Sequence, residues 1–268
     1  MRFNNNFIGY SSEFAFEYFS GSDTEEVFNN NLKTQPSNWY YRNATITYKR
    51  NSNGHRCKEI NDIDLNNYIL FIGCSHTEGI SLELEKTYPY LLSKKLGMDY
   101  YNLSLGATGP DTVLYNLVQW KTKVKQVPKL LIVQWPNTAR YLKMLDNDYI
   151  HPKATEIFDK DEAKLREIGV WNALGDDQRL LVLGDSPSTG YFYSKKMLIN
   201  KMIQALYSES TIVRINYGVL NEPKNTADIE WNNSIHTDYG RDCRHAGIET
   251  NINVTEKIYQ YLSSVQYS

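Results

Sequence analysis

The sequence predicts a three-layer α/β/α sandwich built around a mainly parallel β-sheet. Two continuous apolar runs, Tyr68–Ile72 and Leu130–Gln134, have the length and composition of strands that are buried on both faces. Amphipathic helical patterns lie between such runs, and Gly73 marks the end of the first run. Strands that alternate with helices imply right-handed crossovers, which place helices on both faces of a parallel sheet.

The alternation starts at residue 68, and the segment before it has a different composition. Residues 1–67 are rich in Asn, Tyr, Phe and Ser and contain only short alternations such as Ala44–Tyr48. We therefore expect an N-terminal extension or cap over residues 1–67 and an α/β domain over residues 68–268. A chain of 268 residues is long enough for such a domain to bury a core of its own.

Each expected element has a local reason. Short apolar runs predict strands at Tyr68–Ile72, Met98–Leu103, Leu130–Gln134, Leu180–Leu183 and Thr211–Asn216. Helical periodicity predicts helices at Thr87–Leu96, Asp111–Lys125, Thr155–Ile168, near Tyr193–Tyr207, and at Gly247–Leu262. Pro89 suits the first turn of the first helix, since the N–H that it lacks has no partner there. Asp111 is expected to cap the second helix.

The charge balance excludes several classes of partner. Lys and Arg number 29 against 31 Asp and Glu, which gives a formal charge of −2 and a pI near 6.2. Nucleic-acid binding, which needs a basic face, is therefore not expected. The apolar runs are too short to span a bilayer, and Met1–Asn6 lacks the apolar stretch of a signal peptide. We expect a protein without a membrane partner, located in the cytoplasm or in a virion.

The three cysteines, Cys57, Cys74 and Cys243, argue against a disulfide scaffold and fit a reducing compartment. Cys74 and Cys243 each lie within a polar segment described below, so a disulfide or a Cys/His metal site between them stays an alternative. No C-x-x-C or H-x-x-x-H spacing supports a metal. We expect Cys74 to fill space in the core, and we expect neither a metal nor a cofactor.

Polar segments follow three of the predicted strands, at the carboxyl ends where parallel α/β sheets bind their ligands. These segments are Gly73–Gly79, Asn102–Gly109 and Trp135–Thr138. A fourth polar segment, Asp242–His245, comes shortly before the last helix. Each segment alone is weak evidence, but their order along the chain indicates one shared site.

The order of these segments resembles that of the SGNH (GDSL-like) hydrolase family, over roughly residues 68 to 262. Ser75 stands where the family has its nucleophile in a G-D-S-x-x-x-G block, although Cys74 replaces the Asp of that block. Asp242 and His245 match the family's D-x-x-H block. The resemblance implies a flavodoxin-like sheet and ester hydrolysis by a Ser-His-Asp mechanism.

The resemblance also implies an oxyanion hole. Its donors would be the backbone N–H of Ser75, the backbone N–H of Ala107 or of its neighbour Gly106, and the side-chain amide of Asn137. Ala107 stands where the family usually has Gly, and both residues that flank Asn137 differ from the family's Gly and Asp. One such donor contributes roughly 3–4 kcal/mol to stabilisation of the transition state.

These residue types also suit acyl transfer on chemical grounds. A serine hydroxyl is a weak nucleophile at neutral pH and needs a base within hydrogen-bonding distance, and the ordinary histidine pKa suits that task. We expect His245 to take the Ser75 proton and return it to the leaving alcohol. Asp242 is expected to accept a hydrogen bond from the other ring nitrogen and fix the tautomer.

A second serine, Ser186, carries the letters G-D-S intact in the stretch LVLGDSPSTG. Too little chain remains between Ser186 and Asp242 for two strands that supply an oxyanion-hole Gly and Asn. We therefore assign the nucleophile to Ser75 and expect Ser186 to lie in a Gly/Ser/Pro turn.

Three further residues, His76, Trp135 and Arg140, are candidates for substrate contact because they lie beside the predicted site residues in the sequence. His76 also fits a packed loop histidine, and Arg140 also fits a surface salt bridge. Trp135 shares with Tyr100, Tyr101 and Trp120 an expected place in the core or cleft wall. The remaining histidines are expected at the surface: His55, His151 and His236.

The leading hypothesis is a serine esterase that acts on a small ester, with an O-acetyl group on a carbohydrate as the favoured substrate. This substrate class follows the family's habit and the 21 Tyr, whose rings stack on sugars. Three alternatives stay open: an inactive carbohydrate-binding or structural module, for example in a virion; an O-acyltransferase; and a nucleotide- or flavin-binding flavodoxin-like protein. The last needs a glycine-rich phosphate loop, which Cys74–Gly79 does not supply. The sequence leaves the oligomeric state open.

Overall fold

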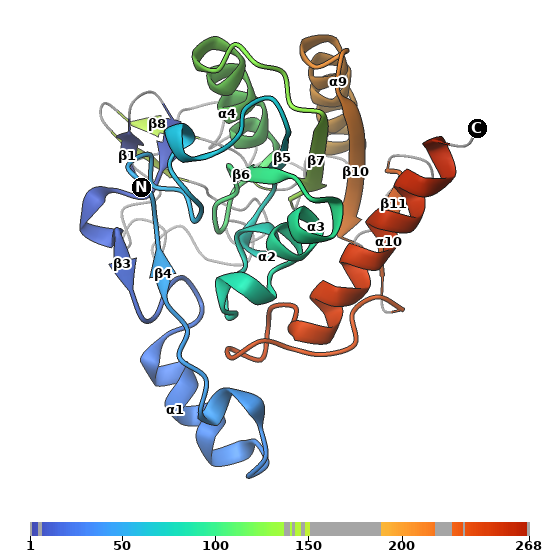
Figure 1. The fold of residues 1–268 in the computed structure, drawn as a ribbon. Helices are drawn as coiled ribbons and strands as arrows, with labels where there is room; N and C mark the ends of the chain where they lie inside the picture. Colours follow the sequence, from blue (N-terminus) through green and yellow to red (C-terminus); the bar gives the residue numbers. More distant parts are fainter. Residues whose placement is uncertain are drawn as a thin grey trace.

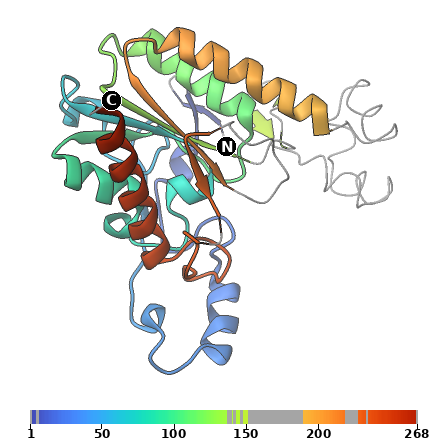
Figure 2. The same ribbon diagram turned by 90° about the vertical axis from the view of Figure 1, so that its right-hand side faces the viewer.

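A computed structural model of the chain describes residues 2–4, 7–136, 140, 143–145, 148–150, 189–217, 227–232 and 234–266. Figures 1 and 2 show a central sheet with helices on both of its faces and the N-terminal segment along one side. Within the described part of the chain, no helix combines the length and the apolar character that crossing a bilayer requires.

The central sheet contains β5 (Tyr68–Ile72), β6 (Asp99–Asn102), β7 (Leu130–Trp135), β10 (Thr211–Tyr217) and β11 (Ile229–Trp231). Its spatial order is β11-β10-β7-β5-β6, and every neighbouring pair is parallel. In chain order this is the 2-1-3-4-5 arrangement of doubly wound, flavodoxin-like sheets. The predicted three-layer fold with a parallel sheet is therefore confirmed.

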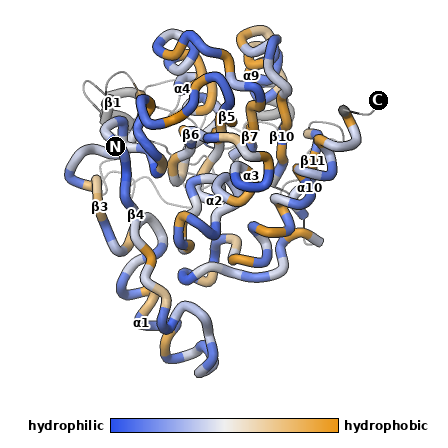
Figure 3. Tube along the Cα trace, viewed as in Figure 1, coloured by the Kyte–Doolittle hydropathy of each residue, from blue (hydrophilic) through white to orange (hydrophobic). Residues whose placement is uncertain are grey.

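Two pairs of helices cover the sheet. α3 (Tyr88–Leu96) and α10 (Ile248–Gln266) pack on one face, and α4 (Pro110–Lys123) and α9 (Thr189–Leu206) pack on the other, as Figure 2 shows. Alternate residues of β5 serve the two cores: Leu70 packs with α4 and α9, whereas Phe71 packs with α3 and α10. Figure 3 shows apolar residues both along the strands of this sheet and on the helices that cover it.

The structure corrects the helix start predicted at Asp111. α4 begins at Pro110, and the extended residue Gly109 occupies the N-cap position. Pro110 is favourable there because the first N–H groups of a helix have no partner within it. Asp111 lies in the first turn instead, and its carboxylate pairs with the ammonium of Lys195 in α9 at 2.6 Å.

Two differences from the predicted element list concern the second half of the chain. β11 is a strand that the sequence did not predict, because three residues are too few to show a period. The predicted helix Thr155–Ile168 and the predicted strand Leu180–Leu183 lie outside the described residues.

The N-terminal segment contains short elements that pack beside the α/β body. Its helices and strands are β1 (Arg2–Asn4), β2 (Phe7–Gly9), β3 (Phe16–Glu17), α1 (Glu25–Thr34) and β4 (Tyr48–Lys49). Short 3₁₀ helices lie at Ser12–Phe14, Tyr40–Arg42, Ile60–Asp62 and, in the α/β body, Leu84–Lys86. β1 pairs with β2 and with β9 (Asp148–Ile150), which in turn pairs with β8 (Lys143–Leu145). α1 projects from the body in Figure 1.

Candidate active site

Ser75 lies at the point where the doubly wound sheet reverses its direction of winding. It is the first residue of α2 (Ser75–Glu78), which follows β5 after Gly73 and Cys74. β5 is bordered by β6 and β7, and ligand sites of such sheets lie at this junction of carboxyl ends. A Cβ on Gly73 would lie 2.4 Å from Thr77 Oγ1, so the tight passage from strand to helix requires glycine.

The structure brings the three predicted reactive side chains together. His245 Nε2 lies 2.7 Å from Ser75 Oγ, and His245 Nδ1 lies 2.7 Å from Asp242 Oδ2. Ser75 and His245 are 170 positions apart in the chain, so the fold rather than the local sequence creates this contact. The three side chains form one continuous line of hydrogen bonds.

The Asp242 carboxylate is fully buried and accepts several hydrogen bonds. Its Oδ1 accepts from the backbone N–H groups of Arg244 and His245, both at 3.0 Å, and its Oδ2 accepts from the His245 ring. Burial acts to raise the pKa of Asp242, but the hydrogen bonds and charge of His245 outweigh it and hold that pKa below its usual value. An ionised carboxylate only accepts, so Nδ1 carries the proton and Nε2 can accept from Ser75.

The loop that carries Asp242 and His245 is a compact turn. The Gly240 N–H donates to the His245 carbonyl at 2.8 Å, and the Cys243 N–H donates to the Gly240 carbonyl at 2.9 Å. Cys243 has a left-handed backbone with φ of 54°. A Cβ on Gly240 would lie 2.6 Å from the Ser81 Cβ, so this loop packs closely on the segment after α2.

The loop between β6 and α4 carries both residues that were predicted as alternative oxyanion-hole donors, Gly106 and Ala107. The Gly106 N–H donates to Glu78 Oε2 at 2.6 Å, so that amide is already engaged. Ala107 has a left-handed backbone with φ of 61°. Among the described residues, the N–H groups of Ser75 and Ala107 have no protein acceptor. Asn137, the third predicted donor, lies outside the described residues.

A buried ionic cluster from the N-terminal segment holds this loop. Glu78, at 1% exposure, accepts from Tyr10 Oη at 3.3 Å and pairs with Arg50 Nη2 at 3.4 Å, besides its bond to Gly106. The Arg50 guanidinium lies 3.8 Å from the centre of the Tyr10 ring. Burial raises the pKa of Glu78, while the charges of Arg50 and Arg56 oppose that rise. No pattern in the sequence indicates this cluster, because its members are not neighbours in the chain.

The candidates for substrate contact differ in their surroundings. The His76 ring centre lies 4.9 Å from that of His245 and 5.5 Å from that of Trp231. Burial, followed by the charges of His245 and His236, lowers the pKa of His76 well below its usual value. Arg140 is half-buried and donates from Nη1 to the Thr108 carbonyl at 3.4 Å.

The prediction that Trp135 contacts substrate does not fit its position. Trp135 is 2% exposed and packs in the core between the sheet and the pair α4 and α9. Its side chain points into that core because residues of a strand alternate between faces. The alternative placement of Trp135 in the core is the one that the structure supports.

The expected surface position of His55 is wrong. His55 is fully buried, where its Nε2 bonds to the Ile8 carbonyl and its Nδ1 bonds to Tyr101 Oη, both at 3.2 Å. Burial lowers the pKa of His55 to about 3, so the ring is neutral and serves as a structural link. His236 is half-buried, and His151 lies outside the described residues, as does the alternative nucleophile Ser186.

The three cysteines are free thiols. Cys74 is buried and donates from Sγ to Gln134 Oε1 at 3.2 Å, whereas Cys243 accepts from Gln35 Nε2 at 3.5 Å. The alternative of a disulfide between Cys74 and Cys243 is therefore not realised. Within the described ranges, no group of His, Cys, Asp and Glu side chains is arranged to hold a metal ion.

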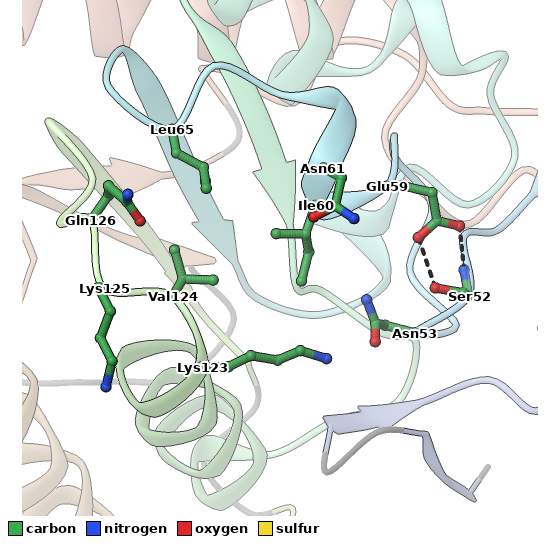
Figure 4. Close-up of a pocket in the computed structure, with 10 residues that line it drawn as sticks. All are labelled: Ser52, Asn53, Glu59, Ile60, Asn61, Leu65, Lys123, Val124, Lys125 and Gln126. Atoms are coloured by element: carbon green, nitrogen blue, oxygen red, sulfur yellow. Dashed lines mark hydrogen bonds between the residues drawn. The ribbon is translucent and has the colours of Figure 1, made fainter.

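A cavity of about 580 Å³ lies elsewhere, beside the segments that precede β5 and β7 (Figure 4). It is therefore near the amino ends of these strands, whereas Ser75 follows the carboxyl end of β5. Its lining contains none of the candidate reactive residues and consists of Ser52, Asn53, Glu59, Ile60, Asn61, Leu65, Lys123, Val124, Lys125 and Gln126.

Comparison with known proteins gave matches among solved structures alone. No family model and no curated protein matches the chain. Similar solved structures include a carbohydrate esterase family 2 enzyme from Corynascus thermopiles (Myceliophthora fergusii), at 14% identity and a TM-score of 0.43, over 74% of this chain and 67% of that chain. The acetyl xylan esterase Est2A from Butyrivibrio proteoclasticus is similar at 13% identity and a TM-score of 0.43, over 75% of this chain and 64% of that chain. The esterase EstA from Pseudoalteromonas sp. is similar at 11% identity and a TM-score of 0.45, over 75% of this chain and 100% of that chain.

Proposed function

We propose that this chain is a serine ester hydrolase of the SGNH type, with Ser75 as nucleophile, His245 as general base and Asp242 as the carboxylate that orients it. The observation that carries the proposal is the pair of 2.7 Å contacts that link Ser75 Oγ, the His245 ring and Asp242 Oδ2. Their position at the carboxyl end of β5 is where a sheet of this order exposes reactive groups.

The reaction follows from the hydrogen-bond line. Ser75 Oγ attacks the ester carbonyl carbon while its proton passes to His245 Nε2. The bond to the leaving oxygen then breaks, His245 gives that oxygen the proton, and an acyl-serine remains. Water then attacks the acyl carbon while His245 takes one of the water protons. The bond to Ser75 Oγ breaks, the acyl group leaves as a carboxylic acid, and His245 returns the proton to Ser75. The Asp242 charge stabilises the imidazolium that forms in both steps.

The oxyanion of each tetrahedral intermediate needs donors that are in place before the reaction. We assign two of them to the N–H groups of Ser75 and Ala107, and the third to the side-chain amide of Asn137. The positive φ of Ala107 supports this assignment. Alanine stands where the family usually has glycine, yet its backbone has the left-handed conformation that glycine favours. Gly106 is not assigned, since its N–H is bonded to Glu78.

We assign the substrate to the class of O-acetylated carbohydrates. Exposed aromatic side chains support this choice, because flat rings stack on sugar faces. Tyr239 belongs to the segment that leads into the Asp242 turn and is 56% exposed, and Phe16 and Tyr18 of the N-terminal segment are 53% and 57% exposed. Water is the proposed acceptor of the acyl group. The location in the cytoplasm or in a virion stays a prediction.

The test uses p-nitrophenyl acetate and a fluorophosphonate probe on the purified full chain. We expect turnover and covalent labelling in the wild type, neither in Ser75→Ala, and both in Ser186→Ala. The reverse pattern for the two serines would contradict the assignment. An unlabelled wild type that still binds glycans would favour an inactive binding module. Release of acetate from an acetylated oligosaccharide, with and without an acceptor sugar, separates hydrolysis from acyl transfer.

A further inference from the structure

A hydroxyl from the N-terminal segment reaches the buried carboxylate of the site. Ser22 Oγ donates to Asp242 Oδ2 at 2.7 Å and lies 3.3 Å from His245 Nδ1. Ser22 and Asp242 are 220 positions apart in the chain. Ser22 therefore contacts the same carboxylate oxygen that accepts from the His245 ring.

The placement of Ser22 does not depend on its own hydroxyl. Ser22 lies in a tight turn closed by two backbone hydrogen bonds between Ser20 and Asp23, at 3.0 and 3.1 Å, with Gly21 at a φ of 63°. The next residue, Asp23, is buried and pairs with Arg241 at 2.8 Å. Two consecutive residues of this turn thus contact two consecutive residues of the loop that carries Asp242.

Only one arrangement of protons satisfies these contacts when Asp242 is ionised. The Ser22 hydroxyl proton must point to Asp242, because the carboxylate has no proton to give. A lone pair of Ser22 Oγ then faces the Nδ1 proton of His245, which Asp242 also accepts. The hydroxyl therefore favours both the charged form of Asp242 and the His245 tautomer whose Nε2 faces Ser75.

We propose that Ser22 is a positioning residue that holds the Asp242 carboxylate against His245 Nδ1 and keeps it ionised. The inference rests on the proposed function for its kinetic consequences. Ser22 touches neither Ser75 Oγ nor His245 Nε2, so it acts through the Asp242 carboxylate and the Nδ1 side of the His245 ring. The N-terminal segment thereby takes part in setting the strength of the base.

Loss of the hydroxyl has a defined consequence for pH dependence. Without the Ser22 hydroxyl as one of its donors, the Asp242 carboxylate binds a proton more readily and attracts the imidazolium proton more strongly. The acidic limb of the kcat/KM profile then moves to higher pH. The other titratable groups that face the pair are unchanged by the substitution, and they are His76, His236, Tyr41 and Cys243.

The experiment compares Ser22→Ala and Ser22→Thr with Ser37→Ala, a control at an exposed serine of the same segment. With p-nitrophenyl acetate we expect kcat to fall about ten-fold in Ser22→Ala with little change in KM, since one hydrogen bond to a charged group is lost. Ser22→Thr keeps a hydroxyl and retains most of the activity. In an Asp242→Asn background the effect of Ser22→Ala disappears, because the two residues act as one unit. If Ser22→Ala does not fold, Ser22→Cys takes its place, since a thiol is a weak donor.

A second readout does not require activity. Carboxyl ¹³C NMR, assigned with Asp242→Asn, follows the titration of Asp242, which we expect to move to higher pH in Ser22→Ala and to stay in place in Ser37→Ala. Unchanged kinetics together with an unchanged Asp242 titration would overturn the role of Ser22. If the wild type neither hydrolyses ester nor binds the fluorophosphonate, the proposed function fails, and the NMR shift alone decides whether Ser22 controls Asp242.

Discussion

Asp23 and Arg241 form a buried ion pair that joins the N-terminal segment to the loop carrying Asp242 and His245. Arg241 Nη2 lies 2.8 Å from Asp23 Oδ2, and the two side chains are 5% and 0% exposed. The Tyr48 hydroxyl donates to the same carboxylate, and Arg241 also donates to the Tyr18 carbonyl. The segment is therefore attached to the candidate site through charge and hydrogen bonds.

Replacement of Asp23 by Asn is expected to lower the free energy of unfolding by about 3–5 kcal/mol. The substitution leaves the Arg241 guanidinium buried without its counter-charge, and such loss costs far more than loss of an exposed pair. Urea unfolding followed by circular dichroism measures the change. Lys58→Ala serves as the control, since its pair with Asp99 is exposed and should contribute at most about 1 kcal/mol. Equal effects in the two variants would contradict the prediction.

Glu78 is expected to influence turnover through the loop that it holds. Glu78→Ala removes the acceptor of the Gly106 N–H, so the neighbouring Ala107 N–H loses its fixed direction. We expect kcat for p-nitrophenyl acetate to fall on the order of 10²-fold, as for loss of one oxyanion donor. Glu78→Gln keeps an acceptor oxygen and should retain more activity than Glu78→Ala.

The control for Glu78 is Glu85→Ala, which removes an exposed carboxylate. Full activity is expected for that variant. A Glu78→Ala variant with wild-type kcat and a wild-type melting temperature would show that the loop keeps its conformation without the carboxylate.

Asp242 is expected to make stability depend on pH in the acid range. Its pKa in the folded chain lies below the ordinary value of 3.8, so the unfolded chain binds the proton more readily. The stabilisation is fully present above pH 3.8 and is lost as the pH falls toward the folded-state pKa. Urea titrations of the wild type and Asp242→Asn from about pH 6 down to about pH 2.5 measure this loss, since they cross the ordinary pKa of 3.8 from above. A difference in unfolding free energy between the two proteins that stays constant, or grows as the pH falls, would contradict the prediction.

His245→Gln is expected to reduce kcat by about 10⁴-fold or more, because the amide cannot take the Ser75 proton. His236→Gln is the matched control, since this half-buried ring lies near the site but outside the hydrogen-bond line. Steady-state hydrolysis of p-nitrophenyl acetate measures both variants. Comparable losses of kcat in the two variants would contradict the assignment of the base to His245.

The sequence predicted the central strands because their apolar runs are continuous and short, as is typical of strands that are buried on both faces. β5 and β7 are buried throughout, so no residue breaks the pattern. β11 has only three residues, and a short alternation of this kind arises by chance. The cap of α4 was misplaced because the side chain of Asp111 fits two positions in a helix start, and only the packing of Lys195 against it decides between them.

The meeting of Ser75 with His245 was predicted from the resemblance of their two segments to the blocks of the SGNH family, since His245 comes before α10 and does not directly follow a predicted strand. The contributions of Ser22, Glu78 and Arg50 had no such signal. They depend on how the N-terminal segment folds against the body, and no periodicity in residues 1–67 encodes that contact. His55 was misplaced for the same reason, because its burial requires Ile8 and Tyr101 on either side.

The turn that contains Ser22 and Asp23 also bears on where this chain can be divided. A fragment starting at residue 68 would keep Ser75, Asp242 and His245 yet strip Arg241 of its counter-ion and Asp242 of a donor. The compositional boundary near residue 67 is therefore a poor place to cut. A shortened version of this chain should therefore keep residues 1–67.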